Sequence, residues 1–198
     1  MGRCWVGVNN MLSDQGIRSV IGSGELVVKS ERDLSVRASS ICLHLSKDIV
    51  VFERTEAEVD VLRGGSYPQG KRRTIGVDGY VIAPGEFLLA ATVENIGLSR
   101  RLVGGLSNIS GLARLGLNTL LSTHVSPGFG EGCARPITLE VYNSSKNHIR
   151  IYSGMRVCHL MISLLEATAT LGYDAQFPGK YLSNSPDVSE FFKNSGVS

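Results

Sequence analysis

Long apolar runs and an excess of one charge are both missing from this chain of 198 residues. No apolar run approaches the roughly 20 residues that a membrane-spanning helix needs, and the N-terminus has no continuous apolar stretch of the signal-peptide type. Twenty basic and 18 acidic residues give a net charge of +2, which argues against a nucleic-acid binder driven by charge. We therefore expect a cytoplasmic protein with neither a membrane nor a nucleic-acid partner.

Cysteine is scarce, and its four copies stand apart in the sequence at Cys4, Cys42, Cys133 and Cys158. No C-x-x-C pair occurs. The one histidine that adjoins a cysteine, His159, would point to the opposite face of a strand from Cys158. A zinc site is therefore not expected, and we interpret the thiols as small buried side chains in a reducing compartment.

Several familiar loop signatures are also missing. Gly22-Ser-Gly24 lacks the third glycine of a dinucleotide-binding loop, and the glycines of 128–132 lead into a strand rather than a helix. Gly105-Leu-Ser107 is not followed by the glycine of a nucleophile elbow. The basic triplet over 71–73 is short and lies in a turn-rich segment, so we interpret it as a solvated surface.

Glycine, by contrast, is abundant, with 23 residues where an average usage of about 7% would give about 14. With 42% hydrophobic and 19% charged residues, the composition is globular, and the chain is long enough for one domain with its own core. So many glycines favour turns and short strands over a helical bundle. We predict a mainly β domain over residues 1–172 and a Gly-, Pro-, Ser- and Asn-rich arm over 173–198.

One short helix is predicted near the N-terminus, where Ser13 can cap it and Ile17, Val20 and Ile21 recur at helical spacing before Gly22. After it, the apolar period changes to two. Strands are predicted at 26–28, 41–45, 49–52, 80–82, 87–93 and 137–141, with two more in 148–165 around a turn at 153–154. Residues 53–79 are charged and rich in turn residues, which indicates a long exposed loop or hairpin.

Polar side chains of possible chemical use are concentrated between residues 107 and 143. A strand over 137–142 would turn its aliphatic residues to one face and Thr138, Glu140 and Tyr142 to the other. Taken alone, Glu140 and Arg114 would be assigned as exposed surface charges, because that is where such residues are usually found.

A series of short motifs nevertheless follows a fixed order along the chain. They are Met11-Leu-Ser-Asp-Gln-Gly-Ile17, Ala83-Pro-Gly-Glu-Phe-Leu-Leu-Ala90, Ser110-x-x-x-Arg114-Leu-Gly-Leu117, Pro127-Gly-Phe129, Thr138-Leu-Glu140-x-x-Asn143, Ser153-Gly-Met155 and Tyr173 followed by Lys180-Tyr181. In this order the motifs resemble the dCTP deaminase branch of the trimeric dUTPase superfamily. The resemblance spans about residues 11–184.

The resemblance implies a dUTPase-like distorted β-barrel of the β-clip type, in a homotrimer whose active sites lie between subunits and are covered by a C-terminal lid arm. It also implies hydrolytic deamination at cytosine C4 without zinc, with dCTP and water giving dUTP and ammonia. Mg²⁺ would arrive on the triphosphate. The H-x-E and P-C-x-x-C motifs of zinc deaminases are missing from the sequence, in agreement with this chemistry.

The resemblance also assigns roles to particular residues. Glu140 would be the base that activates water, since no metal lowers the pKa of water, and Arg114 and Ser110 would hold the water, the base and the phosphates. A backbone carbonyl near Thr123 would orient the water and the amino group. The residues implied in substrate binding are Ile109, Gly111, Leu112, Ala113, Thr123, Ser126, Thr138, Leu139, Tyr173, Lys180 and Asn184.

Departures from the family pattern concern mainly the sugar and the phosphates. The usual Arg-Ser-Ser is Ile109-Ser110-Gly111 here, and the usual Asp before Pro-Gly is Ser126. A tail Gln becomes Asn184, and an early Asp falls at Cys42. The insertion over 133–136 brings in Arg135, a candidate to replace the lost positive charge.

Two other functions remain open from the sequence. The first is a dUTP diphosphatase or a bifunctional deaminase and diphosphatase, although a serine at position 126 cannot act as the carboxylate that aligns water in dUTPases. The second is a nucleotide-binding relative without catalysis. The retention of Ser110, Arg114 and Glu140 together argues against this second alternative, because a bare scaffold would not need all three.

Overall fold

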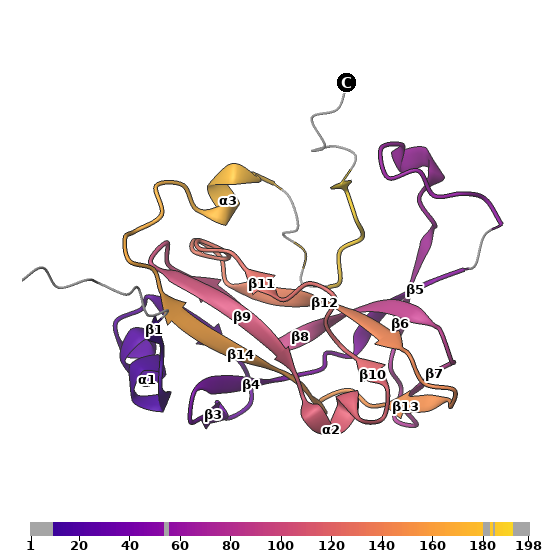
Figure 1. The fold of residues 1–198 in the computed structure, drawn as a ribbon, viewed down its shortest axis with the longest axis horizontal. Coiled ribbons are helices and arrows are strands. Elements are labelled where there is room, and N and C mark those ends of the chain that lie inside the picture. The colour runs from indigo at the N-terminus through magenta and orange to yellow at the C-terminus, as the bar shows by residue number, and fades with distance from the viewer. Residues whose placement is uncertain (1–9, 54–55, 180–182, 184, 192–198) are drawn as a thin grey trace, which may run out of the picture.

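The chain folds almost entirely into antiparallel strands, arranged in two large sheets (Figure 1). The computed structural model describes residues 10–53, 56–179, 183 and 185–191. The first sheet has the order β11 (His124–Val125), β9 (Leu102–Asn108), β14 (Arg156–Leu164), β4 (Ser40–His44), β3 (Val36–Arg37), and β1 (Asn10–Met11) pairs with β14. The second has the order β10 (Leu117–Asn118), β12 (Arg135–Asn143), β8 (Phe87–Leu98), β5 (Asp48–Phe52), β6 (Gly70–Thr74), and β2 (Leu26–Lys29) pairs with β8.

The prediction of a mainly β protein is confirmed, although the described strands do not close into a ring. Both large sheets have two free ends in their pairing order. A separate two-stranded sheet joins β7 (Tyr80–Ile82) to β13 (Ile149–Ile151). The two strands predicted on either side of 153–154 both exist, but they pair with different neighbours rather than with each other.

The predicted helix is α1 (Asp14–Gly22), and the predicted cap is in place. The Ser13 side chain accepts a hydrogen bond from the Gly16 amide at 3.4 Å, which satisfies one of the amides that the first turn leaves without a helical partner. Ile17 is fully buried, and Val20 and Ile21 pack against the core. The helical spacing of these three residues therefore gives α1 its buried face.

The segment predicted as an exposed loop or hairpin contains a short 3-10 helix, η1 (Gly64–Ser66), and the strand β6. The pairing of β6 with β5 makes the segment a hairpin. Lys71, Arg72 and Arg73 lie in this edge strand rather than in a loop, and all five residues of β6 are exposed. The hairpin alternative is therefore confirmed, as is the predicted exposure of the three cations, although they lie in a strand and not in a turn.

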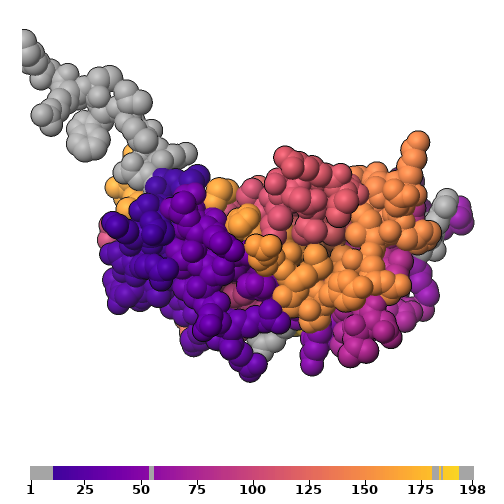
Figure 2. Space-filling model, turned by 90° about the horizontal axis from the view of Figure 1, so that it is seen from below, coloured from indigo at the N-terminus to yellow at the C-terminus, as the bar shows by residue number. Residues whose placement is uncertain are grey.

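Two more short helices flank the sheets. The single turn α2 (Ser110–Ala113) follows β9 at the lower edge of Figure 1, and the view from below in Figure 2 shows this side of the molecule, with residues near 110 at the surface. The helix α3 (Tyr173–Gln176) lies at the opposite edge and begins the C-terminal arm. In the described ranges, no helix is long and apolar enough to cross a membrane.

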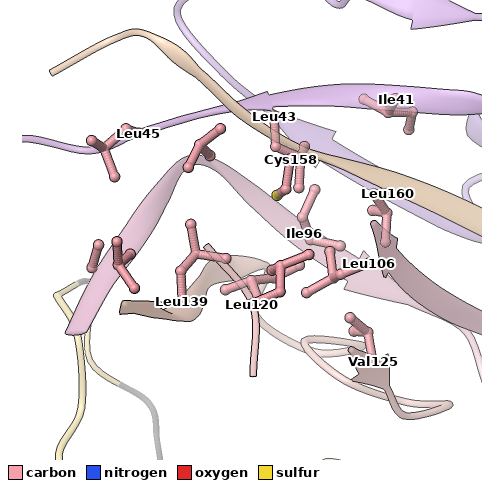
Figure 3. Close-up of a cluster of buried hydrophobic side chains, with 14 of the residues drawn as sticks. Ile41, Leu43, Leu45, Ile96, Leu106, Leu120, Val125, Leu139, Cys158 and Leu160 are labelled. Atoms are coloured by element: carbon pink, nitrogen blue, oxygen red, sulfur yellow. The ribbon is translucent and has the colours of Figure 1, made fainter. Parts of the chain in front are cut away.

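The core lies between the two large sheets (Figure 3). Leu139 of β12 and Ile96 of β8 come from the second sheet, and they share one cluster with Leu43, Cys158 and Leu160 of the first. All five side chains are 0% exposed. Burial of apolar area at about 25 cal/mol per Å² is the main favourable term in such a core, and it fixes the faces that β8 and β12 turn outward.

Candidate active site

Glu140 lies on the outward face of β12. The burial pattern of this strand alternates strictly, with Ile137, Leu139 and Val141 buried and Thr138, Glu140 and Tyr142 only partly buried. The predicted division of faces is therefore confirmed. Because the core fixes the inward face, a shift of one residue in register would bury the carboxylate, so the position of Glu140 is set by packing.

One oxygen of the Glu140 carboxylate is held by the backbone. Oε2 accepts a hydrogen bond from the Ser122 amide at 3.0 Å. Across the sheet, Leu89 of β8 is the direct cross-strand neighbour of Glu140, and it gives one side of the carboxylate an apolar wall. In the part of the chain that the structure describes, Oε1 accepts no hydrogen bond, so this oxygen is free to take a proton or hold a water molecule.

Glu140 lines a cavity of about 1170 Å³. The polar residues Ser126, Thr138 and Tyr173, all expected from the resemblance to contact substrate, line the same cavity. Four of the expected residues, counting Glu140, are thus brought together within one subunit. This volume exceeds the usual range for a small-molecule site of about 300–1,000 Å³, so the cavity has room for a nucleotide.

Aromatic rings form one wall of this cavity. Phe129 follows the tight turn at Gly128, and its ring centroid lies 5.9 Å from that of Tyr173. A Cβ at Gly128, which has a φ of +77°, would lie 2.6 Å from the Cα of Gly172. A side chain at position 128 would therefore separate the turn from the root of the arm, and with it Phe129 from Tyr173.

The end of the described chain returns to the same cavity. Residues 187–191 all contribute to its lining, and the Asp187 amide donates to Thr138 Oγ1 at 3.5 Å. The side chain of Val188 approaches β6 at Gly70, where an added Cβ would lie 3.2 Å from Val188 Cγ1. The arm therefore passes over the site within its own subunit.

The other two predicted catalytic residues lie elsewhere. Ser110 and Arg114 belong to α2 and its C-terminal cap, on the side of the molecule shown in Figure 2, and neither lines the cavity with Glu140. Both are exposed, as are Gly111 and Ala113, and Arg114 has no ion pair among the described residues. Ile109 and Leu112 are partly buried beside them. Within one copy of the chain, the predicted catalytic set is therefore divided into two separate parts.

The predicted contact of Leu139 with substrate needs correction for its side chain. The Leu139 side chain is 0% exposed and belongs to the core, so it cannot touch a ligand in the cavity. The Thr123 carbonyl accepts a hydrogen bond from the Leu106 amide at 2.8 Å, which joins its loop to β9. The role of a carbonyl near Thr123 stays a prediction, because a carbonyl oxygen can accept a second hydrogen bond. Lys180 and Asn184 lie outside the described residues.

Arg135 does not replace the lost phosphate-binding charge. Its side chain is 3% exposed, and both terminal nitrogens are bonded to the carboxylate of Asp174. It is also absent from the cavity lining. A guanidinium that is buried and paired in this way is not available to a phosphate in this arrangement.

Several residues of the cavity were not predicted from the sequence. His124 lies beside Ser126, and the stacked rings of Phe52 and Phe87, with centroids 5.8 Å apart, line the apolar end. Both rings lie at an end of a continuous apolar run, where Phe52 is the last residue of β5 and Phe87 the first of β8, so no alternation marked them. No signal in the sequence indicated that 59–70 and 187–191 would converge on them.

The cysteines are only partly as expected. Cys42 and Cys158 are buried, but Cys133 is exposed, so the prediction of buried thiols is wrong for Cys133. Burial raises the pKa of both buried thiols, to about 12 for Cys158, and thereby keeps them protonated. Among the described residues, no three His, Cys, Asp or Glu side chains are grouped so as to hold a metal ion.

Comparison with known proteins identifies the family. Residues 11–165 match the family model for dCTP deaminase-like proteins. This chain belongs to the dCTP deaminase-like family. The family resemblance drawn from the motifs is therefore confirmed.

The sequences of individual relatives align with this dCTP deaminase-like chain over most of its length. The dUMP-forming dCTP deaminase of Hydrogenobaculum sp. is 38% identical over 79% of this chain and 83% of its own. The dUMP-forming dCTP deaminase of Persephonella marina is 33% identical, over 86% and 92%. The dCTP deaminase of Thermomicrobium roseum is 34% identical, over 86% and 88%.

A solved structure shares the fold. The 2′-deoxycytidine 5′-triphosphate deaminase of Agrobacterium tumefaciens superimposes with a TM-score of 0.59 at 19% identity, over 79% of this chain. The match covers 48% of the Agrobacterium chain, so this chain spans about half the length of that protein. The arrangement of the two sheets is therefore that of a known deaminase fold.

Proposed function

We propose that this protein deaminates a cytosine nucleotide, with dCTP as the substrate, by hydrolysis at C4. The observation that carries the proposal is the Glu140 carboxylate, which has one oxygen held by the Ser122 amide and the other free on a cavity wall. Family membership supports a nucleotide as the occupant of that cavity. The triphosphate would bring its own Mg²⁺ as part of the substrate.

In this proposal Glu140 accepts and then donates each proton that is transferred. Its free oxygen takes a proton from water while the water oxygen bonds to C4, and N3 receives that proton. A second proton, from the hydroxyl now on C4, passes through Glu140 to the amino group. The C4–N bond then breaks, ammonia leaves, and the carboxylate is regenerated.

Arg114 and Ser110 would reach this carboxylate from another copy of the chain. Both are exposed on α2, outside the cavity that holds Glu140, so one subunit alone cannot bring the three residues together in this conformation. In a homotrimer with active sites between subunits, the exposed α2 of one subunit would face the cavity that holds Glu140 of the next. A guanidinium near Glu140 would favour the ionised carboxylate that proton abstraction requires.

Release of pyrophosphate is the second candidate activity. The relatives from Hydrogenobaculum and Persephonella are named as dUMP-forming, which favours a bifunctional enzyme that converts dCTP to dUMP. Ser126 argues for the simpler reaction to dUTP, because a hydroxyl is a poor base for aligning a second water. The two candidates differ in the nucleotide that they release, dUTP or dUMP, and in whether pyrophosphate is formed.

A product analysis distinguishes them. The protein is incubated with dCTP, CTP and dUTP in the presence of Mg²⁺, and ammonia, dUTP, dUMP and pyrophosphate are measured. Ammonia and dUTP without pyrophosphate support the deaminase, and equal amounts of ammonia, dUMP and pyrophosphate support the bifunctional enzyme. Pyrophosphate from dUTP without any ammonia from dCTP indicates a dUTP diphosphatase. Nucleotide binding without any product would indicate the non-catalytic relative and contradict both candidates.

Replacement of the base tests the role of Glu140. Glu140→Gln keeps the shape and an oxygen for the Ser122 amide, so we expect an unchanged fold and nucleotide affinity but a loss of turnover of about 10²-fold or more. Glu31→Gln, at an exposed residue, is the matched control. A Glu140→Gln variant with more than about a tenth of wild-type turnover would rule out this role.

A further inference from the structure

Arg135 and Asp174 form a partly buried ion pair between β12, the strand that carries Glu140, and the arm. Arg135 opens β12, and its two terminal nitrogens donate to the two oxygens of Asp174 at 3.0 and 2.6 Å. The side chain of Arg135 is 3% exposed and that of Asp174 is 28% exposed. A two-point contact of this kind fixes the direction of the carboxylate as well as its distance.

The same guanidinium also contacts an aromatic ring. Its Cζ lies 4.2 Å from the ring centroid of Phe129. Phe129 in turn contacts Tyr173, whose ring centroid lies 5.1 Å from that of Phe177. Arg135 is therefore in contact with the strand, the turn and the arm at the point where all three meet.

The helix α3 depends on such contacts. It has only four residues, which is far below the length at which a helix is stable in water by itself. The Tyr173 amide donates to the Pro127 carbonyl at 2.8 Å, and the Asp174 side chain supplies the bond to Arg135. The atom Arg135 Nε is buried and, among the described residues, has no hydrogen-bond partner. The cost of removing this guanidinium from water is therefore offset mainly by its two hydrogen bonds to Asp174.

We propose that Arg135 is a positioning residue that clamps the root of the C-terminal arm, and that it thereby holds Tyr173 and Phe129 in the wall of the cavity that contains Glu140. Neither Arg135 nor Asp174 lines that cavity, so the clamp acts through the arm. For its effect on catalysis the inference rests on the proposed function. It predicts weaker binding of the nucleotide with little change in the chemical step.

The test uses Asp174→Asn in the full chain, because this change removes the negative charge and keeps the shape. Asp174→Glu retains the charge and serves as the rescue. Glu131→Gln is the matched control, since Glu131 makes a 3.7 Å contact with Arg100 and both side chains are largely exposed. For each variant, amide exchange of residues 173–177 and the KM and kcat for dCTP are measured.

We expect exchange at 173–177 to accelerate about tenfold or more in Asp174→Asn, because loss of a charged hydrogen bond changes an equilibrium by at least that factor. KM should rise about tenfold while kcat stays within about threefold. Asp174→Glu should recover most of both effects, and Glu131→Gln should behave as wild type.

Unchanged exchange at the arm in Asp174→Asn would overturn the clamp, and so would an equal effect of Glu131→Gln. A fall in kcat at constant KM would overturn the positioning role. If Asp174→Asn unfolds the whole chain, the double change Arg135→Met and Asp174→Leu leaves no unpaired buried charge, and wild-type behaviour of that variant would contradict the proposal. A wild-type protein without turnover would refute the proposed function only, because the exchange data test the clamp independently.

Discussion

At the scale of single residues, three glutamates differ in how many of their oxygens are occupied. Glu94 is 3% exposed, and both of its oxygens bond to His44, at the ring nitrogen and the backbone amide. Both oxygens of Glu86 also accept hydrogen bonds, from the Tyr80 hydroxyl and the Ala83 amide. Glu140 has one oxygen held and one free. The first two carboxylates are therefore structural, and of these three only Glu140 keeps an unoccupied oxygen among the described contacts, as its proposed role requires.

Ser126 gives the first residue-scale prediction. It lines the cavity and offers a neutral hydroxyl where the family pattern has a carboxylate. A carboxylate would make a charge-assisted hydrogen bond to the sugar 3′-hydroxyl. We therefore expect Ser126→Asp to raise kcat/KM for dCTP about tenfold, and to raise the preference for dCTP over CTP.

The measurement is kcat/KM for dCTP and CTP in the wild type, in Ser126→Asp and in the control Ser126→Ala. Ser126→Ala should change the preference little, because a neutral bond contributes less than a charged one. A wild-type protein that already prefers dCTP by about a thousandfold, with that preference lowered in Ser126→Asp, would show that this view of the sugar site is wrong.

At the scale of elements, β7 carries a pH-dependent contact. The Tyr80 hydroxyl donates to Glu86 Oε1 at 2.7 Å. Burial is the largest cause and this hydrogen bond the second, and they raise the pKa of Tyr80 to about 12. The ordinary pKa of tyrosine is about 10, so the folded state favours the neutral phenol. The resulting stability is fully present below about pH 10 and is lost as the pH rises toward 12.

Urea unfolding between about pH 8 and 11.5 tests this contact in wild type and Tyr80→Phe. The free energy of unfolding of the wild type should decline more steeply above about pH 10 than that of Tyr80→Phe, which has no phenol at this position. Tyr152→Phe, at an exposed position, should follow the wild type. Parallel curves for wild type and Tyr80→Phe would contradict the assignment.

The elements that could be predicted from the sequence are those with a local signal. The cap at Ser13 and the spacing of Ile17, Val20 and Ile21 predicted α1, and the alternation over 137–142 predicted the outward face that carries Glu140. A hairpin was one of two alternatives for 53–79, but strand β6 itself could not be located, because its five exposed residues, three of them cationic, carry no alternation. Its position depends on pairing with β5, which is a contact between distant segments and leaves no local pattern.

The residues of the site divide in the same way, into those with a local signal and those without one. The family motifs identified Glu140, Thr138, Ser126 and Tyr173, which the cavity brings together. They did not reveal that Arg135 would bind Asp174, because that pair joins residues 39 positions apart and neither belongs to a motif. The position of Leu139 in the core could have been inferred, since it follows from the alternation itself.

At the scale of the whole molecule, the separation of α2 from Glu140 predicts complementation between subunits. Glu140→Gln and Arg114→Ala are each expected to be inactive alone. When the two variants are unfolded together and refolded in equal amounts, sites shared between subunits can combine an intact Glu140 with an intact Arg114. Random mixing into trimers would restore about a quarter of the sites.

Light scattering of the mixture should give the mass of a trimer, and turnover should approach that fraction of the wild-type value. The same two proteins mixed without unfolding serve as the control, because intact trimers do not exchange subunits quickly if the interface is extensive. A monomeric mass with full wild-type activity, or no recovery after joint refolding, would contradict the shared site.

Among the described residues, no further strand pairs with the outer edge of β6, and this has a consequence for the behaviour of the protein at high concentration. An unpaired strand edge offers amides and carbonyls to any extended segment, including the same edge of a second molecule, and this is a common start of aggregation. The charged run Lys71, Arg72 and Arg73 lies along that edge and is exposed. Two molecules that approached edge to edge would bring these cations together. The charges that made the segment hard to recognise as a strand therefore protect the sheet from growing beyond its own chain.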